Sequence, residues 1–419
     1  MKKLDEIHVA GKSSLNGSVF IQGSKNAVLP MMAASLLHRG VSVLKGCPAI
    51  SDVFCMEEIL KNLGAVTWWK GHTLYMDCTQ AEKTEIPGHC TRRMRSSVIL
   101  LAAVLARNHI CTMGYPGGCV IGKRPIDLHI QALREMGASI GEEEMKLKAL
   151  CVKFQGSLIS LKKSSVGATQ QVILAAVLAE GETQINGCAK EPEIVWLCRY
   201  LRSMGAQITG EGSECICIRG VKELGPGNFR VPPDRIVAGT YICAAAATKS
   251  EITLCNAPVE ELTAFLDVYR EMGGQYQRKS GTLLVNGKRA DRPVSCVETE
   301  VYPGFPTDLQ SPLMAVLAGN SGRSVIREKI FEKRFQTAVQ MKRMGAQIEI
   351  QEDRAVIEGG RTLLGCPVEA GDLRGGAALI LAAMQAEGET CIRRAEVIFR
   401  GYEHICEDLE SLGCRIWKT

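Results

Sequence analysis

Leu174-Ala175-Ala176-Val177-Leu178-Ala179, with Met204-Gly205 further along, is one copy of a pattern that recurs six times in this 419-residue chain. Each copy has an alanine-rich apolar helix followed by a β-branched run, and a second helix that ends in Leu-Gly or Met-Gly. The alanine markers are Ala34, Ala103, Ala176, Ala245, Ala315 and Ala383. The glycine markers are Gly64, Gly137, Gly205, Gly273, Gly345 and Gly413. Neighbouring markers of either series are 68 to 73 residues apart, so two independent markers share one period.

The pattern predicts local structure as well as a repeat. A glycine after Leu or Met is typical of the residue that ends a helix in a left-handed conformation. A helix that is apolar nearly all round is expected to be buried on most sides. We therefore predict six similar α/β units, three in each of two domains. Val231-Pro232-Pro233-Asp234 lies at the midpoint, where two prolines cannot continue a helix or a central strand, and is the best candidate for a boundary or hinge.

Composition narrows the class of protein. Hydrophobic residues make up 46% and charged residues 23% of the chain, as in a soluble globular protein. The net charge of +5 is too mild and too dispersed to indicate nucleic-acid binding, but it suits small anionic substrates. No apolar run is long enough for a membrane span, and the N-terminal residues lack a signal-peptide pattern. We expect a cytoplasmic protein whose 18 cysteines are reduced thiols.

The loop Pro116-Gly117-Gly118-Cys119-Val120-Ile121-Gly122-Lys123-Arg124-Pro125 carries the strongest chemical signal. A thiol among glycines and two cations is poorly suited to packing a core. The cations favour the reactive thiolate and can also hold a phosphate or carboxylate. From the residues alone, a flexible surface loop with an incidental cysteine is an equal alternative.

Three further polar segments each precede an apolar helix. Lys25, in Gly23-Ser24-Lys25-Asn26, puts a cation at a helix start, which is unfavourable unless it meets an anion; the alternative is a solvated turn. Arg95 does the same in Met94-Arg95-Ser96-Ser97. The stretch from Lys163 to Thr169 offers hydroxyls and backbone N–H groups that either cradle a phosphate or form an ordinary N-cap.

In the second half of the chain, Asp308 lies between a rigid turn and an apolar helix, where it acts as a general base or simply caps the helix. Arginines lie beside element boundaries at Arg334, Arg374 and Arg400, and arginine binds phosphate and carboxylate in a bidentate manner. His129 is expected to make a structural hydrogen bond rather than to activate Cys119.

Together these stretches resemble the enolpyruvyl transferases, and within them the branch that acts on a nucleotide sugar. The resemblance covers essentially the whole chain. The motifs that carry it are Gly23 to Asn26, Pro116 to Cys119, Arg124-Pro125-Ile126-Asp127-Leu128-His129, Ser165 to Thr169, Glu191-Pro192-Glu193, Phe305 to Asp308, Asp372-Leu373-Arg374 and Arg400-Gly401-Tyr402-Glu403. The resemblance implies an inside-out α/β barrel fold with one domain at 23–232, carrying the Cys119 loop, and a second formed by 1–22 plus 233–419.

The resemblance also implies a reaction: transfer of the enolpyruvyl group of phosphoenolpyruvate to the 3′-hydroxyl of UDP-N-acetylglucosamine, with release of phosphate. This is the first committed step of bacterial peptidoglycan synthesis, on which cell shape and division depend. Neither a metal nor an organic cofactor is implied, and no nucleic-acid or membrane partner. Fosfomycin is expected to alkylate Cys119, as it does in the family.

The residue roles that the resemblance implies fall into four groups. The catalytic residues would be Cys119 as proton donor and site of a covalent adduct, Asp308 as acceptor of the hydroxyl proton, and Lys25. Phosphoenolpyruvate would be held by Lys25, Asn26, Arg124 and Arg400. UDP-N-acetylglucosamine would be held by Arg95, Arg124, Pro125, Ile126, Asp127, Leu128, Lys163, Ser164, Ser165, Val166, Gly167, Asp308 and Ile330. The supporting residues of the cleft would be Arg334, Asp372 and Arg374.

Lys333, Phe399 and Pro312 depart from the usual family pattern, and none of them has an implied chemical role. Two alternatives remain open at this point. One is an enolpyruvyl transferase with another acceptor, such as shikimate 3-phosphate. The other is a non-catalytic protein that binds the nucleotide sugar and regulates a partner.

Overall fold

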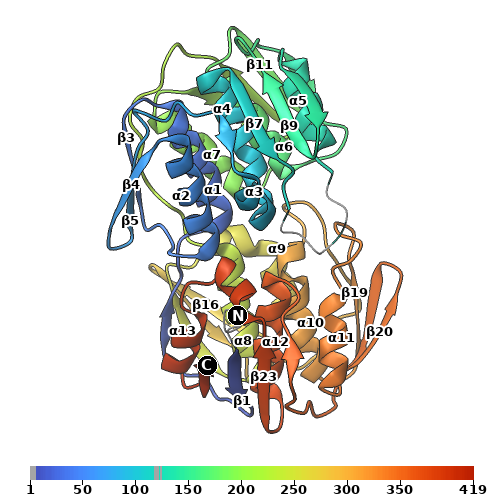
Figure 1. Cartoon of the computed structure of the whole chain (residues 1–419). Helices are drawn as coiled ribbons and strands as arrows, with labels where there is room; N and C mark the ends of the chain where they lie inside the picture. The colour runs from blue at the N-terminus through green and yellow to red at the C-terminus, as the bar shows by residue number, and fades with distance from the viewer. Residues whose placement is uncertain (1–5, 118–121, 123–124) are drawn as a thin grey trace. The chain divides into compact units, whose positions relative to one another are not determined.

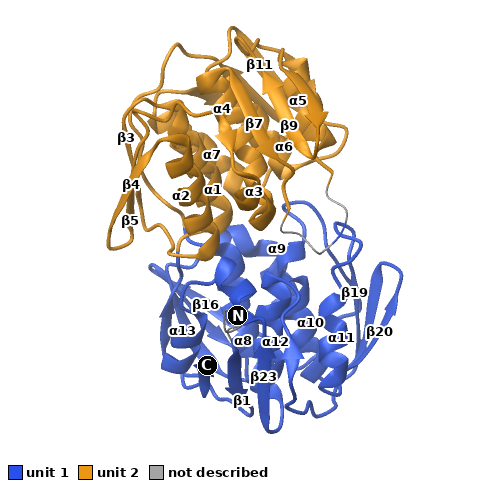
Figure 2. Ribbon diagram, in the orientation of Figure 1, with its two compact units in different colours: residues 1–22, 120–123, 233–419 blue, residues 23–119, 124–232 orange. Residues whose placement is uncertain are grey.

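The computed structural model describes residues 6–117, 122 and 125–419, and the chain forms two compact units (Figures 1 and 2). Unit 1 comprises Met1–Gln22, Val120–Lys123 and Pro233–Thr419, and unit 2 comprises Gly23–Cys119 and Arg124–Pro232. Each unit has its own hydrophobic core.

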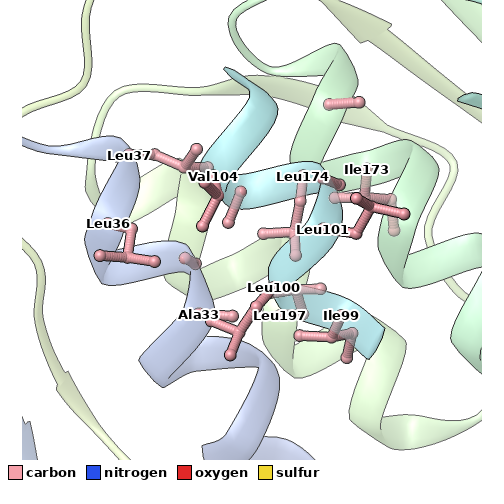
Figure 3. Packing of buried hydrophobic residues seen from close by; sticks show 14 of the residues in the cluster. Ala33, Leu36, Leu37, Ile99, Leu100, Leu101, Val104, Ile173, Leu174 and Leu197 are labelled. Carbon is pink, nitrogen blue, oxygen red and sulfur yellow. The ribbon is translucent and has the colours of Figure 1, made fainter. Parts of the chain in front are cut away.

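Three alanine-rich helices form the centre of each unit, as the repeat predicts. In unit 2 they are α1 (Lys25–Ala34), α4 (Leu100–Asn108) and α6 (Val166–Ala176). In unit 1 they are α8 (Arg235–Ala247), α10 (Gln310–Gly319) and α12 (Leu373–Gln385), which all contact one another. All six marker alanines are fully buried, because methyl side chains allow such helices to pack closely. Figure 3 shows Leu100 and Val104 of α4 within this packing.

Each of the six repeats also has a second helix, which is amphipathic and ends beside its marker glycine. In unit 2 these helices are α2 (Ser51–Leu63), α5 (Asp127–Glu135) and α7 (Pro192–Ser203). In unit 1 they are α9 (Thr263–Glu271), α11 (Gln336–Arg343) and α13 (Ile405–Ser411). The six marker glycines have φ between +93° and +106°, as the sequence predicts. Unit 2 also has the short helix α3 (Gly88–Arg93).

Short 3₁₀ turns precede or follow several of these helices. They are η1 (Ser35–Leu37), η2 (Arg95–Ile99), η3 (Val259–Leu262), η4 (Thr307–Leu309) and η5 (Ala395–Arg400).

Three four-stranded sheets belong to unit 2. The first has the order β14 (Asn228–Arg230), β3 (Val41–Lys45), β5 (Thr73–Asp77), β4 (Val66–Lys70). The second has the order β6 (Glu85–Ile86), β7 (Ile110–Gly114), β9 (Lys146–Leu150), β8 (Ser139–Glu143). The third has the order β10 (Leu158–Ser160), β11 (Glu182–Asn186), β13 (Cys215–Arg219), β12 (Gln207–Thr209).

Three similar sheets belong to unit 1. The first has the order β22 (Val368–Glu369), β23 (Glu389–Arg393), β1 (Ile7–Ala10), β24 (Ile416–Lys418). The second has the order β16 (Gln275–Lys279), β17 (Thr282–Asn286), β15 (Glu251–Cys255), β2 (Ser18–Phe20). The third has the order β18 (Val297–Glu298), β19 (Arg323–Arg327), β21 (Arg354–Glu358), β20 (Gln347–Gln351).

Every sheet contains one parallel pair and two antiparallel pairs, and three sheets are completed by strands from distant parts of the sequence. β14 supplies the parallel partner of β3, and β2 supplies that of β15. β1 inserts between β23 and β24, so the start of the chain closes the last repeat. The predicted six-unit α/β architecture is confirmed.

Two further expectations can be compared with the described residues. None of the seventeen described cysteines forms a disulfide; the eighteenth, Cys119, lies outside those residues. Within residues 6–117, 122 and 125–419, no helix has both the length and the apolar character needed to cross a membrane.

Candidate active site

In unit 1, Asp308 is held by two arginines. It lies in η4, and Arg334 Nη2 donates to its Oδ1 at 2.9 Å. Arg374 Nε donates to Asp308 Oδ2 at 3.2 Å, and Arg374 Nη2 lies 3.1 Å from the same oxygen. Both arginine side chains are 3% exposed, whereas that of Asp308 is 28% exposed. Leu309, not Asp308, is at the N-cap position of helix α10, and both Asp308 carboxylate oxygens contact arginines.

Arg374 is fixed from both of its ends. Its backbone lies in the first turn of α12, where Asp372 Oδ1 accepts from the N–H groups of Arg374 and Gly375 at 2.9 Å each. Its guanidinium lies 5.4 Å from the centre of the Tyr402 ring, and the Tyr402 hydroxyl pairs with Thr240 Oγ1 at 2.8 Å. Asp372 is therefore a helix cap that places Arg374.

The charge of Arg374 is maintained although the side chain is buried. Burial acts against the charged form, but the neighbouring Tyr402, Asp308 and Asp234 raise the pKa of the guanidinium above its ordinary value. Burial raises the pKa of Tyr402 too, so this phenol keeps its proton. The buried guanidinium therefore places a permanent positive charge against Asp308.

The Asp308 carboxylate is partly exposed although two buried arginines hold it. The two arginines supply three N–H contacts to this carboxylate, which is nevertheless 28% exposed. Among the described residues, the buried atoms Arg334 Nε and Arg374 Nη1 have no hydrogen-bond acceptor. The cluster thus combines a partly exposed proton acceptor with buried, fixed positive charge.

Glu328 organises the segment around Asp308, and the sequence analysis did not identify it. Its Oε2 accepts from Thr307 Oγ1 at 2.8 Å, next to Asp308 in the chain. Its Oε1 accepts from the backbone N–H groups of Ile330 at 2.9 Å and Phe331 at 3.1 Å. One buried carboxylate therefore fixes both Asp308 and the predicted nucleotide contact Ile330. The only indication of this role in the sequence is the position of Glu328, an acidic residue directly after a buried strand.

In unit 2, the predicted cation at the start of α1 meets an internal anion. Lys25 Nζ lies 2.7 Å from Asp52 Oδ2, and the two side chains are 10% and 4% exposed. Asp52 lies in the first turn of α2, where an acidic residue is ordinarily taken as a favourable helix-dipole contact. The alternative of a solvated turn lysine is wrong, and the partner Asp52 was not foreseen.

Arg95 lies at the first position of η2 and connects two flanking segments. It donates to Pro116 O at 3.4 Å and to Pro125 O at 3.3 Å, on the two sides of the cysteine loop. Gln171 of α6 accepts from Ala102 N–H at 2.9 Å and donates to Val98 O at 2.6 Å. These bonds join η2 and the first turn of α4 to the middle of α6.

The beginning of α6 is an N-cap, one of the two alternatives from the sequence. Ser165 accepts from Ala168 N–H at 3.3 Å. Gly167 lies against the buried ring of His129, and a Cβ on Gly167 would come within 2.5 Å of His129 Cε1. Glycine is therefore required for this approach, which joins α6 to α5.

Most of the remaining predicted residues lie at the starts of helices or in the loops beside them, and they differ in burial. Ile126 is buried, and Pro125 and Asp127 are exposed beside it at the start of α5. Other predicted residues that are exposed or half-buried are Asn26, Leu128, Lys163, Ser164, Val166 and Arg400. Cys119 and Arg124 lie outside the described residues, as does Lys123.

The sequence and the fold match one family of enzymes. The sequence model of EPSP synthase (3-phosphoshikimate 1-carboxyvinyltransferase) matches residues 9–409. The chain therefore belongs to the carboxyvinyltransferase family, also called the enolpyruvyl transferases.

Within that family, close relatives carry one name. UDP-N-acetylglucosamine 1-carboxyvinyltransferase 2 of Caldanaerobacter subterraneus is 41% identical over 413 residues, which cover 99% of both chains. The Bacillus subtilis protein of the same name is 39% identical over 416 residues, covering 99% of this chain and 97% of that one.

Solved structures confirm the fold. The enolpyruvyl transferase NikO from Streptomyces tendae superposes with a TM-score of 0.90 at 23% identity, covering 99% of each chain. EPSP synthase from Acinetobacter baumannii superposes with a TM-score of 0.76 at 20% identity over the whole of both chains. The predicted enolpyruvyl transferase fold is confirmed.

Proposed function

We propose that this chain transfers the enolpyruvyl group of phosphoenolpyruvate to the 3′-hydroxyl of UDP-N-acetylglucosamine and releases phosphate. The observation that carries the proposal is the Asp308 carboxylate, which is partly exposed and held by two buried arginines. The name shared by relatives about 40% identical over 99% of the chain supports this choice of acceptor.

The reaction is an addition followed by an elimination. Asp308 takes the proton of the 3′-hydroxyl as its oxygen bonds to C2 of phosphoenolpyruvate, and Cys119 gives a proton to C3. The C2–O bond to phosphate then breaks while C3 loses a proton, which restores the double bond in the enol ether product. Each substrate atom is accounted for, and no oxidant or reductant is needed.

Cations hold the charged substrate during these steps. In this proposal Lys25, Arg124 and Arg400 bind the phosphate and carboxylate of phosphoenolpyruvate, with Asn26 beside them. Fixed positive charges favour the transition state because they need no reorganisation as charge develops. Asp372 contributes indirectly, because it caps the helix that carries Arg374.

The nucleotide sugar would occupy the surface formed by Arg95, the start of α5 and the start of α6. Pro125 to Leu128 and Lys163 to Gly167 flank this region of unit 2, and the family resemblance also implies Ile330 as a contact of the nucleotide sugar. This activity begins peptidoglycan synthesis, so the proposal places the chain in cell-wall biogenesis in the cytoplasm, with cell shape and division depending on it. Fosfomycin is expected to inactivate the enzyme by alkylating Cys119.

The test is a comparison of two acceptors. Wild-type protein is incubated with phosphoenolpyruvate and either UDP-N-acetylglucosamine or shikimate 3-phosphate, and the product is identified by mass spectrometry. The proposal predicts an enolpyruvyl adduct of the nucleotide sugar alone. An adduct of shikimate 3-phosphate alone, or ligand binding without turnover, would refute it.

A variant tests the role of Asp308 separately. Asp308→Asn keeps the shape of the side chain but removes the proton acceptor, and is expected to lower kcat by about 10²- to 10⁴-fold. Asp353→Asn is the matched control, because Asp353 also pairs with an arginine, Arg327, at 2.6 Å. Equal rates for the two variants would refute the assignment of Asp308 as the base.

A further inference from the structure

The outward face of the sheet β22-β23-β1-β24 carries a row of polar side chains at the point where the chain begins. In β1, Ile7 and Val9 are fully buried, so His8 points outward. His8 lies directly opposite Cys391 of β23 on one side and Trp417 of β24 on the other. Glu389 is two residues from Cys391 in β23, so it lies on the same face.

Three side chains of this face bring together nitrogen, oxygen and sulfur donors. His8 Nε2 lies 3.8 Å from Glu6 Oε2, and Cys391 Sγ lies 3.6 Å from the same oxygen. One donor atom from each of the three residues lies within 4.8 Å of the other two. Metal bonds of about 2.0 to 2.3 Å in a tetrahedral site place neighbouring ligand atoms roughly 3.3 to 3.8 Å apart. Small side-chain adjustments would therefore let the three atoms share one ion.

The imidazole of His8 is already oriented for such a role. Its Nδ1 is 2.8 Å from Glu389 Oε1, and its ring stacks on Trp417 with 5.4 Å between centres and 11° between planes. A carboxylate on one ring nitrogen fixes the tautomer that leaves the other nitrogen free to bind a metal. That other nitrogen, Nε2, is the one that faces Glu6.

The neighbouring groups are compatible with a bound cation. Glu6 Oε1 is 3.5 Å from Arg393 Nε, which leaves Oε2 directed at His8 and Cys391. Thr419 Oγ1 lies 3.3 Å from His8 Nε2, near enough to serve as a fourth ligand. A mixed imidazole, thiolate and carboxylate set is typical of Zn²⁺ and related ions rather than of Mg²⁺ or Ca²⁺.

We propose that Glu6, His8 and Cys391 bind a single Zn²⁺-class cation on the outward face of this sheet. The site lies entirely within unit 1 and uses no residue of the proposed reaction, so it does not depend on the proposed function. Binding deprotonates the Cys391 thiol and releases that proton to solvent. Because the ion links β1 to β23, it holds the first strand of the chain in the sheet that this strand completes.

A second cluster with the same residue types is a useful comparison. Glu58, His89 and Cys90 of unit 2 also bring their donor atoms within 4.8 Å of one another. There, however, the same His89 Nε2 is 3.3 Å from both Glu58 and Cys90, and Glu58 also pairs with Arg93 at 2.8 Å. Among the described residues, no carboxylate orients the other nitrogen of His89 as Glu389 orients that of His8, so we favour the site at His8.

The test uses the full chain, treated with a chelator, dialysed, and titrated with Zn²⁺ alone in a calorimeter. Wild type is expected to bind one equivalent and to show a higher Tm with zinc. His8→Gln and Cys391→Ser are expected to lose both effects, and Glu389→Gln to bind about 10- to 100-fold more weakly. Cys90→Ser and Cys296→Ser, which alter the second cluster and an exposed thiol, are matched controls expected to behave as wild type.

No zinc binding by wild type would overturn the proposal, as would undiminished binding by His8→Gln or Cys391→Ser. A measurement on wild type alone covers the case in which those variants do not fold. X-ray absorption at the zinc edge is expected to show one sulfur ligand with nitrogen and oxygen ligands. A spectrum with no sulfur, or with two or more, would overturn the proposal as well.

Discussion

The ion pair between Lys25 and Asp52 offers a quantitative test of how unit 2 is held together. The two charges are 2.7 Å apart and nearly buried. At an effective dielectric constant near 20, their attraction is about 6 kcal/mol. Removal of one partner from a buried pair costs about 3–5 kcal/mol, because the other charge stays buried and loses its ion-pair partner. We therefore expect Asp52→Asn or Lys25→Met to lower the free energy of unfolding by up to about this amount.

The assay is a double-mutant cycle measured by urea unfolding. Lys25→Met combined with Asp52→Asn is expected to cost less than the sum of the single variants, with a coupling energy of about 2 kcal/mol or more. The control is the exposed pair Lys146–Glu85, whose side chains are 49% and 68% exposed and whose coupling is expected to be about 0–1 kcal/mol. Equal coupling in the two cycles would refute the reasoning.

Three further predictions concern other buried charges. Arg107 donates to five backbone carbonyls, including Cys78 O at 2.6 Å. Arg107→Met is therefore expected to lower the free energy of unfolding by about 3 kcal/mol. Arg39→Met, at an exposed site, is the control, and equal urea midpoints for the two variants would contradict this prediction. Burial opposes the charge of Glu57, yet hydrogen bonds from Lys61, Thr67 and Trp69 hold the pKa of Glu57 below its ordinary value of 4.5. The stability that the charged Glu57 carboxylate adds to the fold is therefore present above pH 4.5 and is lost as the pH falls through the lower pKa of the folded state. Unfolding curves should thus show that Glu57→Gln has a lower free energy of unfolding than wild type, by an amount that shrinks in acid. A difference in stability that does not depend on pH would exclude this cause. Glu328→Gln is expected to lower kcat about 10- to 100-fold by displacing Asp308, with little change in KM; steady-state rates equal to wild type would show that Glu328 has no positioning role.

Much of the architecture could be predicted because it depends on local rules. A helix that ends in a left-handed residue favours glycine, and closely packed central helices favour alanine, so both markers recur with the period of the fold. The completing strands could not be predicted in the same way. β1, β2 and β14 are three or four residues long, and their partners lie far away in the sequence. Strands of this length are too short to show a periodic pattern that would identify a distant partner.

The candidate site shows the same limit. Arginines at element boundaries were visible in the sequence, but nothing there indicated that Arg334 and Arg374 both bind Asp308. Asp52 and Glu328 were missed because acidic residues near helix starts and strand ends are usually caps or solvated groups. Their function depends on burial against a partner far away in the chain, which only the tertiary structure supplies.

The central claim is that this chain transfers an enolpyruvyl group with Cys119 as the proton donor. The most direct measurement is phosphate release from phosphoenolpyruvate, with and without UDP-N-acetylglucosamine, by wild type and Cys119→Ser. We expect release by wild type that requires the nucleotide sugar and that collapses in the variant. A folded wild type that releases no phosphate in response to the nucleotide sugar, or a variant as active as wild type, would contradict the account.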